Sequence, residues 1–245
     1  MSSSPRRSPG TRHSLSGLPG NRHLAAASSV ETLRYDDTPM PSKLLIAIPN
    51  YGNNAPGLFL DSMVRLMTHL ARKFGPGEID YMRVGLMYID IARNMIWDEA
   101  RKRQTEALLC LDDDMTFTPQ TFEAVWNTPG DVVSGLYFQR RQPPTAPCMY
   151  QRMPNGHHSA VMAYPKDAVI DVDAVGFGFV LIRKPVIDAL EHPFTTKTAK
   201  GEDIAFCENA KAAGFSVKVN TAAKVGHILT VPLIIEESNA GPEFG

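Results

Sequence analysis

Residues 108–119 read LLCLDDDMTFTP. The first four are apolar and predict a buried strand, and Asp112, Asp113 and Asp114 follow directly at its end. Carboxylates this close together raise one another's pKa and resist joint ionisation, so the cluster costs stability unless a cation or a helix N-terminus compensates it. We therefore predict a positive charge beside this strand end.

The Asp-x-Asp spacing suits the binding of a divalent cation. In an extended segment Asp112 and Asp114 project to one side and Asp113 to the other. Mg²⁺ is usually held by one or two carboxylates together with substrate phosphates. The alternative is that the acids complement the dipole of a helix that begins after Thr118, a good N-cap, with Pro119 at its first position. The spacing alone leaves both interpretations open.

Strand and helix patterns alternate around this segment. Residues 43–49, KLLIAIP, form a continuous apolar run, and residues 57–74 carry apolar side chains at helical spacing. With a hairpin around Asn155-Gly156, this alternation predicts an α/β fold: a mainly parallel mixed sheet flanked by helices, with an inserted hairpin. Further strands are predicted at 78–84, 106–111, 131–138, within 168–183 and at 215–219, and further helices at 90–103, 119–126, 184–191 and 202–214.

The composition changes near both ends of the chain. Residues 1–38 are rich in Ser, Pro, Gly and Arg and hold too little apolar surface to offset the entropy of ordering, which predicts a disordered basic tail. A solvated tail is favoured over a contact with nucleic acid. We predict one domain over residues 39–235 and a flexible C-terminal end at 236–245.

Charge and cysteine usage exclude several classes of protein. The formal net charge of −1 provides no overall attraction to nucleic acid or to an anionic membrane. No apolar run approaches the roughly 18 residues of a membrane helix, so no membrane insertion is expected. The three cysteines are widely spaced, which argues against a disulfide framework and a zinc ribbon. We expect a soluble cytoplasmic protein.

Several segments, taken together, resemble the family-2-like glycosyltransferases with the GT-A fold, the fold of nucleotide-diphospho-sugar transferases. The resemblance covers roughly residues 43–230 and depends on the order and approximate spacing of the set. The segments are LLIAIPNYG (44–52), IARNMIWDEA (91–100), LLCLDDDMTFTP (108–119), DVVSGLYFQR (131–140), VDAVGFGFVLIRK (172–184), GEDIAFCENAKAAGF (201–215) and VGH (225–227).

The resemblance implies a role for each of the acids. Asp112 and Asp114 resemble the family's DxD motif, with Asp114 the more direct metal ligand and Asp112 shared between the metal and the nucleotide ribose. His227 resembles the histidine that completes the metal site. Glu202 and Asp203 resemble the ED motif, in which the aspartate acts as general base on the acceptor hydroxyl. The implied cofactor is Mn²⁺ or Mg²⁺.

The resemblance also implies a site for a nucleotide-diphospho-sugar donor. Pro49, Asn50 and Tyr51 match the loop that holds the nucleobase and ribose. Arg93 resembles the basic residue near the base or diphosphate, and Asp113 adjoins the same site. On its own, Arg93 could equally pair with an acid on its own helix.

Two features of the resemblance bear on the nucleobase of the donor. A UDP-sugar is favoured as the donor. Many members of the family, however, carry an acidic stretch that reads uracil, and here the corresponding residues 78–88 read EIDYMRVGLMY.

The implied reaction is an inverting, divalent-metal-dependent transfer of a hexosyl or pentosyl group to an acceptor hydroxyl. A bound cation stabilises the charge that grows on the leaving diphosphate. A positioned carboxylate takes the proton of the acceptor, and the helix dipole should keep Asp203 ionised for this role. The acceptor is open among a glycan, a protein, a small molecule and a modified DNA base.

Two other functions compete with this interpretation. One is a non-catalytic nucleotide-sugar or glycan-binding protein of the same fold. The other, less favoured, is a nucleotidyltransferase, which needs a basic loop after its first strand; PNYGNNAPG (49–57) has no Lys or Arg.

Other polar and glycine positions have both a functional and a structural interpretation. Arg140 and Arg141 could reach the diphosphate or acceptor, or lie in solvent at a strand end. Gly176 and Gly178 could admit a ligand or mark a bulge. The adjacent His157 and His158 are interpreted as solvated turn residues, because neighbouring residues on a hairpin point to opposite faces.

Overall fold

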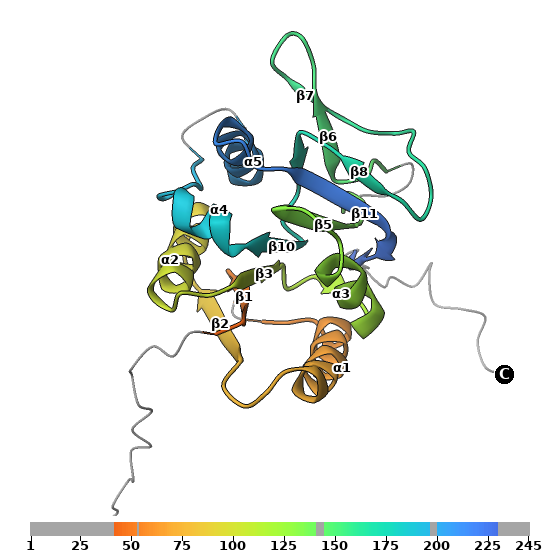
Figure 1. The fold of residues 1–245 in the computed structure, drawn as a ribbon. Coiled ribbons are helices and arrows are strands. Elements are labelled where there is room, and N and C mark those ends of the chain that lie inside the picture. The colour runs from red at the N-terminus through yellow and green to blue at the C-terminus, as the bar shows by residue number, and fades with distance from the viewer. Residues whose placement is uncertain (1–41, 53, 141–144, 197–199, 230–245) are drawn as a thin grey trace, which may run out of the picture. The chain divides into compact units, whose positions relative to one another are not determined.

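The computed structural model describes residues 42–52, 54–140, 145–196 and 200–229 (Figure 1). Both predicted ends, 1–38 and 236–245, lie outside these ranges, as does Arg141. The proposed domain limits at 39 and 235 therefore stay predictions. None of the helices in the described ranges combines the length and apolar character needed to cross a membrane.

The described residues form a seven-stranded sheet with the order β2-β1-β3-β10-β5-β11-β8. Strands β1, β2, β3, β5 and β11 run parallel, and β10 and β8 run antiparallel to their neighbours. This is the mainly parallel mixed sheet that the sequence predicts. Its strands are β2 (Ile79–Gly85), β1 (Leu44–Asn50), β3 (Ala107–Leu111), β10 (Phe179–Arg183), β5 (Val132–Leu136), β11 (Val217–Lys224) and β8 (Val169–Asp171).

Helices cover both faces of this sheet (Figure 1). Alternate residues of β1 point to opposite faces: Leu44 and Ile46 pack with α1 and α3, while Leu45 and Ala47 pack with α2, α4 and α5. Burial on both faces explains why β1 and β3 are apolar throughout. The helices are α1 (Gly57–Lys73), α2 (Ile89–Lys102), α3 (Pro119–Trp126), α4 (Lys184–Ala189) and α5 (Glu202–Ala212).

Helix limits agree closely with the sequence patterns. Helix α3 spans the predicted residues, and the Thr118 hydroxyl accepts a hydrogen bond from Thr121 N at 3.2 Å as its N-cap. Helix α5 ends before Gly214, whose φ of 90° and hydrogen bond to Lys211 O make it the C-terminal glycine expected there. The residue types at Thr118 and Gly214 were therefore sufficient to locate the start of α3 and the end of α5.

The predicted hairpin is confirmed and belongs to a second, three-stranded sheet. Strands β6 (Met149–Arg152) and β7 (His158–Ala160) pair antiparallel across a turn in which Gly156 has a φ of 81°. Strand β9 (Ala174–Val175) pairs with the other side of β6. The strand signal predicted within 168–183 corresponds to three strands, β8, β9 and β10, because the chain passes from one sheet to the other and back.

A third pairing is too short to predict from periodicity. Strand β4 (Met115–Thr116) pairs antiparallel with β12 (Gly226–His227), which brings the C-terminal part of the domain beside the aspartate cluster.

The two glycines before β10 make room for a side chain of the protein. An added Cβ at Gly176 would lie 2.2 Å from Tyr137 Oη, and one at Gly178 would lie 2.9 Å from Tyr137 Cζ and 2.3 Å from Met115 Cε. Gly178 N also donates a hydrogen bond to Tyr137 Oη at 2.9 Å. In this structure the buried Tyr137 ring, rather than a ligand, occupies the space beside them.

All three cysteines of the sequence lie in the described ranges and are free. Burial raises the pKa of Cys110 and of Cys207 to about 12, and that of Cys148 to about 11. Their thiols therefore stay protonated near neutral pH.

The tight contact at Gly178 leads to a first prediction. The substitution Gly178→Ala should lower the free energy of unfolding by about 1–3 kcal/mol, because the added methyl overlaps the buried Tyr137 ring. Urea unfolding would measure it, with Gly52→Ala as the matched control, since nothing lies within 4 Å of a Cβ there. Equal stability of the two variants would contradict the proposed packing role.

Candidate functional site

The predicted site residues gather at one edge of the main sheet. Asn50 ends β1, and the three aspartates follow β3, so both lie at the carboxyl edge of neighbouring parallel strands. Because β10 is antiparallel to β3, its beginning lies at the same edge, and Asp112 N donates to Gly178 O at 3.1 Å.

Arg93 links this edge to the start of α5. Its Nη2 donates to Asp112 Oδ1 at 2.9 Å, and its Nε lies 3.5 Å from Glu202 Oε1, within ion-pair distance but without hydrogen-bond geometry. The side chain is only 5% exposed, and its Cζ lies 4.8 Å from the centre of the Phe177 ring. Arg93 is therefore a buried cation shared by the acids of the two motifs.

This arrangement decides one of the alternatives left by the sequence. Arg93 does not pair with Asp90 or Asp98 on its own helix. Asp90 Oδ2 instead accepts a hydrogen bond from Thr196 Oγ1 at 2.8 Å, and Asp98 Oδ2 lies 3.9 Å from His192 Nδ1. The positive charge predicted beside Asp112 is thus partly supplied by the protein. A direct contact between Arg93 and the donor stays a prediction.

The acid cluster carries the pKa shifts expected of crowded carboxylates. Burial raises the pKa of Asp112 to about 6; Arg93 opposes this shift, and the neighbouring carboxylates add to it. Burial and the charge of Asp114 also raise the pKa of Asp113, whose carboxylate accepts a hydrogen bond from Asn50 Nδ2. The three carboxylates therefore have different partners, and Asp113 contacts Asn50 at the end of β1.

Asp114 lies between two cationic or potentially cationic side chains. Its Oδ2 is 2.5 Å from Arg140 Nη1 and 3.3 Å from His227 Nε2. Burial alone would raise the pKa of Asp114, but His227 and Arg140 outweigh it and the pKa falls. The Arg140 side chain is 55% exposed, so this ion pair faces solvent.

His227 is held by contacts at both of its ring nitrogens. Its Nδ1 lies 2.8 Å from Phe138 O, and since a carbonyl can only accept, Nδ1 must carry a proton. In the neutral ring the lone pair is then on Nε2, so Nε2 can donate to Asp114 Oδ2 only when the ring is protonated. Burial lowers the pKa of His227, but the hydrogen bonds to Asp114 and Phe138 O raise it overall.

The donor set fits a divalent cation in part. Asp114 and His227 come together, and carboxylate and imidazole are suitable ligands for Mn²⁺. Asp112, the third predicted ligand, is turned toward Arg93. Within the described ranges no group of three or more His, Cys, Asp or Glu side chains is arranged to hold a metal ion by itself. Any further ligands would have to come from a substrate, from water or from a movement of Asp112.

The predicted donor loop contains one fixed and one exposed side chain. Asn50 is buried, and its Nδ2 also donates to Asn54 O at 2.9 Å. Tyr51 is 73% exposed and free to stack on a planar ligand. Arg83, which the sequence analysis missed, donates to Asn50 Oδ1 at 3.4 Å from the neighbouring β2. Its position near the end of the predicted strand 78–84 was a usable signal.

Asp203 differs from the prediction in its ionisation. It lies in the first turn of α5, and its Oδ1 accepts from Ile204 N at 2.7 Å. We expected the helix dipole to keep its pKa low. Burial and then the charge of Glu202 outweigh the backbone hydrogen bonds, so the pKa of Asp203 is raised. A raised pKa makes this carboxylate a stronger base near neutral pH.

Solved structures share this fold at low sequence identity. The crystal structure of A197 from STIV aligns with a TM-score of 0.51 and 16% identity, over 80% of this chain and 98% of that chain. The structure of GalNAc-T7 with UDP, GalNAc and Mn²⁺ aligns with a TM-score of 0.53 and 12% identity, over 79% of this chain and 45% of that chain. No protein-family model and no curated protein sequence matches. The GT-A fold predicted from the sequence is confirmed by these likenesses.

The pairing of Arg93 with both Asp112 and Glu202 leads to a prediction about stability. The substitution Arg93→Met should lower the free energy of unfolding by about 3 kcal/mol, because it leaves the Asp112 and Glu202 carboxylates without their buried cation. Urea unfolding at pH 8, well above the pKa of about 6 of Asp112, would measure it. Arg72→Met, on the exposed surface of α1, is the matched control and should change stability by less than about 0.5 kcal/mol. A similar small effect at Arg93 would refute its bridging role.

Proposed function

We propose that this protein is a divalent-metal-dependent glycosyltransferase that moves a sugar from a nucleotide-diphosphate donor to an acceptor hydroxyl with inversion. One observation carries the proposal. Arg93 joins Asp112 at the end of β3 to Glu202 at the start of α5, so acids of both predicted motifs lie at the carboxyl edge of the main sheet, the edge at which open α/β sheets generally bind ligands.

Asp114 and His227 are the residues that would hold the metal ion, with Asp112 nearby. When bound there, a divalent ion would stabilise the negative charge that develops on the departing diphosphate. The carbonyl of Phe138 holds His227 with Nε2 toward Asp114, and the β4–β12 pairing keeps the two residues together, so both would be available to a metal ion.

Asp203 is the proposed general base. Its buried position raises its pKa, and a base of higher pKa accepts the proton of an acceptor hydroxyl more readily. Glu202 lies next to it and is held by Arg93, so we propose that Glu202 positions the start of α5. Its negative charge also contributes to the raised pKa of Asp203.

The donor would lie at the carboxyl end of β1. We propose that Tyr51 stacks on the nucleobase and that Asn50 and Asp113, already hydrogen-bonded to each other, contact the ribose together with Pro49 and Asp112. GalNAc-T7 was solved with UDP, GalNAc and Mn²⁺, so UDP-sugars and Mn²⁺ are the first ligands to test. Whether a hexosyl or a pentosyl group is transferred, and to which acceptor, stays open in this proposal.

Arg140 is a cation that a metal ion would have to displace. Its guanidinium contacts the same Asp114 oxygen that faces His227, and the exposed side chain can move without disturbing the core. We propose that Arg140 neutralises Asp114 in the free protein and turns to the donor diphosphate when the metal binds.

The proposed base leads to a test of the function. Asp203→Asn should reduce Mn²⁺-dependent hydrolysis of UDP-sugars by about 10²–10⁴-fold, because water then lacks its proton acceptor. In the unmodified protein the rate should fall as the pH is lowered from 7 to 5, because the pKa of Asp112 is about 6 and the pKa of Asp203 is raised above its ordinary value, so that protonation of both acids moves to higher pH.

Two controls accompany this measurement. Asp61→Asn, at an exposed position of α1, should leave the rate unchanged. Stabilisation by a UDP-sugar with Mn²⁺ in a thermal unfolding scan should persist in the Asp203 variant. Full activity of Asp203→Asn would sink the proposed mechanism, and tight donor binding without turnover in the unmodified protein would favour the non-catalytic alternative.

The Arg140–Asp114 pair leads to a prediction about metal affinity. Arg140→Ala should bind Mn²⁺ alone up to about fivefold more tightly, because the metal no longer competes with an exposed ion pair. Electron paramagnetic resonance of free Mn²⁺, without donor, would measure it. His227→Ala should weaken the same affinity, and Arg65→Ala on α1 should not change it. Unchanged or weaker binding in Arg140→Ala would rule out the competition.

A further inference from the structure

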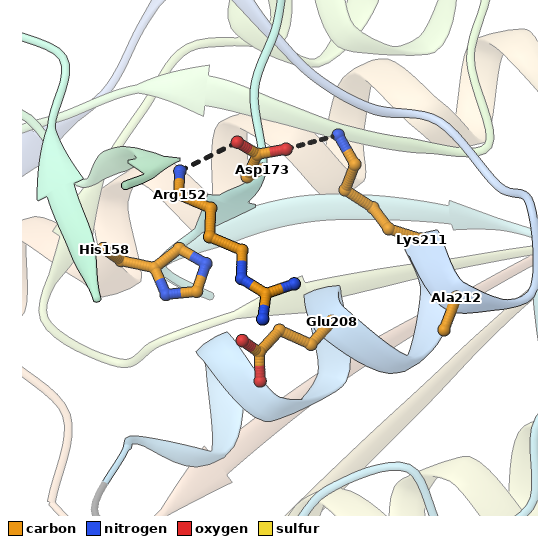
Figure 2. Close-up of a pocket in the computed structure, with 6 residues that line it drawn as sticks. All are labelled: Arg152, His158, Asp173, Glu208, Lys211 and Ala212. Carbon is orange, nitrogen blue, oxygen red and sulfur yellow. Dashed lines mark hydrogen bonds and ion pairs between the residues drawn. The ribbon is translucent and has the colours of Figure 1, made fainter. Parts of the chain in front are cut away.

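A separate polar pocket lies between the hairpin and α5 (Figure 2). Its volume is about 260 Å³, and its lining residues are Arg152, His158, Asp173, Glu208, Lys211 and Ala212. Pockets for drug-sized ligands usually measure roughly 300–1,000 Å³. This pocket therefore has room for a small ligand or for one unit of a larger one.

One side of the pocket is a fixed framework. The Asp173 carboxylate lies 2.7 Å from Lys211 Nζ and accepts from Arg152 N at 2.8 Å, as Figure 2 shows, and from Gln151 Nε2 at 2.5 Å. Lys211 also donates to Val172 O at 3.1 Å. These contacts tie the hairpin to α5 and hold the pocket walls in place.

The other side of the pocket presents polar groups that have no hydrogen-bond partner among the described residues. Among the described residues, the Arg152 guanidinium has no hydrogen bond or ion pair, and His158 Nε2 is buried without a partner. Glu208 pairs with Lys200 through Oε1 at 2.5 Å, which leaves its other oxygen available. In Figure 2 the Arg152 side chain extends toward Glu208, so a donor and an acceptor face the same space.

The charges in the pocket point to a neutral ligand. Its lining contains two cationic side chains, Arg152 and Lys211, and two carboxylates, Asp173 and Glu208. Burial lowers the pKa of His158, which keeps its ring neutral near pH 7. An anion or a cation would therefore meet repulsion as well as attraction. A hydroxyl group can accept from the guanidinium and donate to the carboxylate at the same time.

The pocket is distinct from the proposed catalytic site. Asp203 and Glu208 are five residues apart on α5, which separates them by about 7.5 Å along the axis and by roughly 140° around it. Glu208, Lys211 and Ala212 lie together on the face that the hairpin covers.

We propose that this pocket binds a single neutral sugar residue through its vicinal hydroxyl groups, with Arg152, His158 and Glu208 as the recognising side chains. A sugar bound there would hold a glycan against α5. The binding requires neither donor nor metal, so its failure would leave the proposed transferase activity standing.

The test is a titration of the full chain, without donor or metal, followed by ¹⁵N–¹H and imidazole NMR shifts. The probes are the methyl glycosides of glucose, galactose, mannose and N-acetylglucosamine, with glucuronate and glucosamine as charged counterparts. At least one neutral glycoside should shift Arg152, His158 and Glu208 saturably at millimolar concentration. The absence of such shifts for every neutral probe would overturn the proposal, as would stronger binding of glucuronate or glucosamine.

Variants separate recognition from a general effect on the fold. Arg152→Ala keeps the backbone N–H that binds Asp173, so the hairpin should stay in place while sugar affinity falls at least fivefold. Glu208→Gln should weaken binding as well. Arg72→Ala, on the exposed surface of α1, should bind as the unmodified protein does. Equal affinity in Arg152→Ala and Arg72→Ala would refute the assignment.

Discussion

The buried guanidinium of Arg93 is the constraint on which the arrangement of this domain depends. It lies against Phe177, and Phe177 packs edge-on with Phe194 and Phe206 in an aromatic cluster that also contains Trp97. A cation removed from water at this depth is tolerated only if carboxylates accompany it. The core can therefore close only when the strand end at Asp112 and the start of α5 come together around Arg93.

The aspartate cluster shows two different ways to neutralise crowded carboxylates. Asp112 shares a cation that is enclosed by the core, whereas Asp114 pairs with Arg140, whose side chain is largely in solvent. An enclosed partner fixes geometry, and an exposed partner can be exchanged at little cost. The Asp112–Arg93 pair is thus fixed by the core, while the Asp114–Arg140 pair can open without a change in the core.

Local patterns predicted more of the fold than of the site. Periodicity, the Thr118 cap and the Gly214 terminus located helices correctly, because these signals arise within a few residues. The partners of Arg93, the two-residue β4–β12 pairing and the raised pKa of Asp203 come from segments far apart in the chain. Composition and spacing contain no measure of such burial. The sequence therefore predicted a low pKa for Asp203, whereas burial raises it.

The two buried thiols of Cys110 and Cys207 and the half-buried thiol of Cys148 have a practical consequence. Only a thiolate reacts readily with maleimides, and the native cysteines remain protonated at the pH of a labelling reaction. A single cysteine placed on the exposed face of α1, for example by V64C, would therefore be modified selectively in the folded protein. Fluorescent or spin probes could be attached to this protein without first removing its own sulfur atoms.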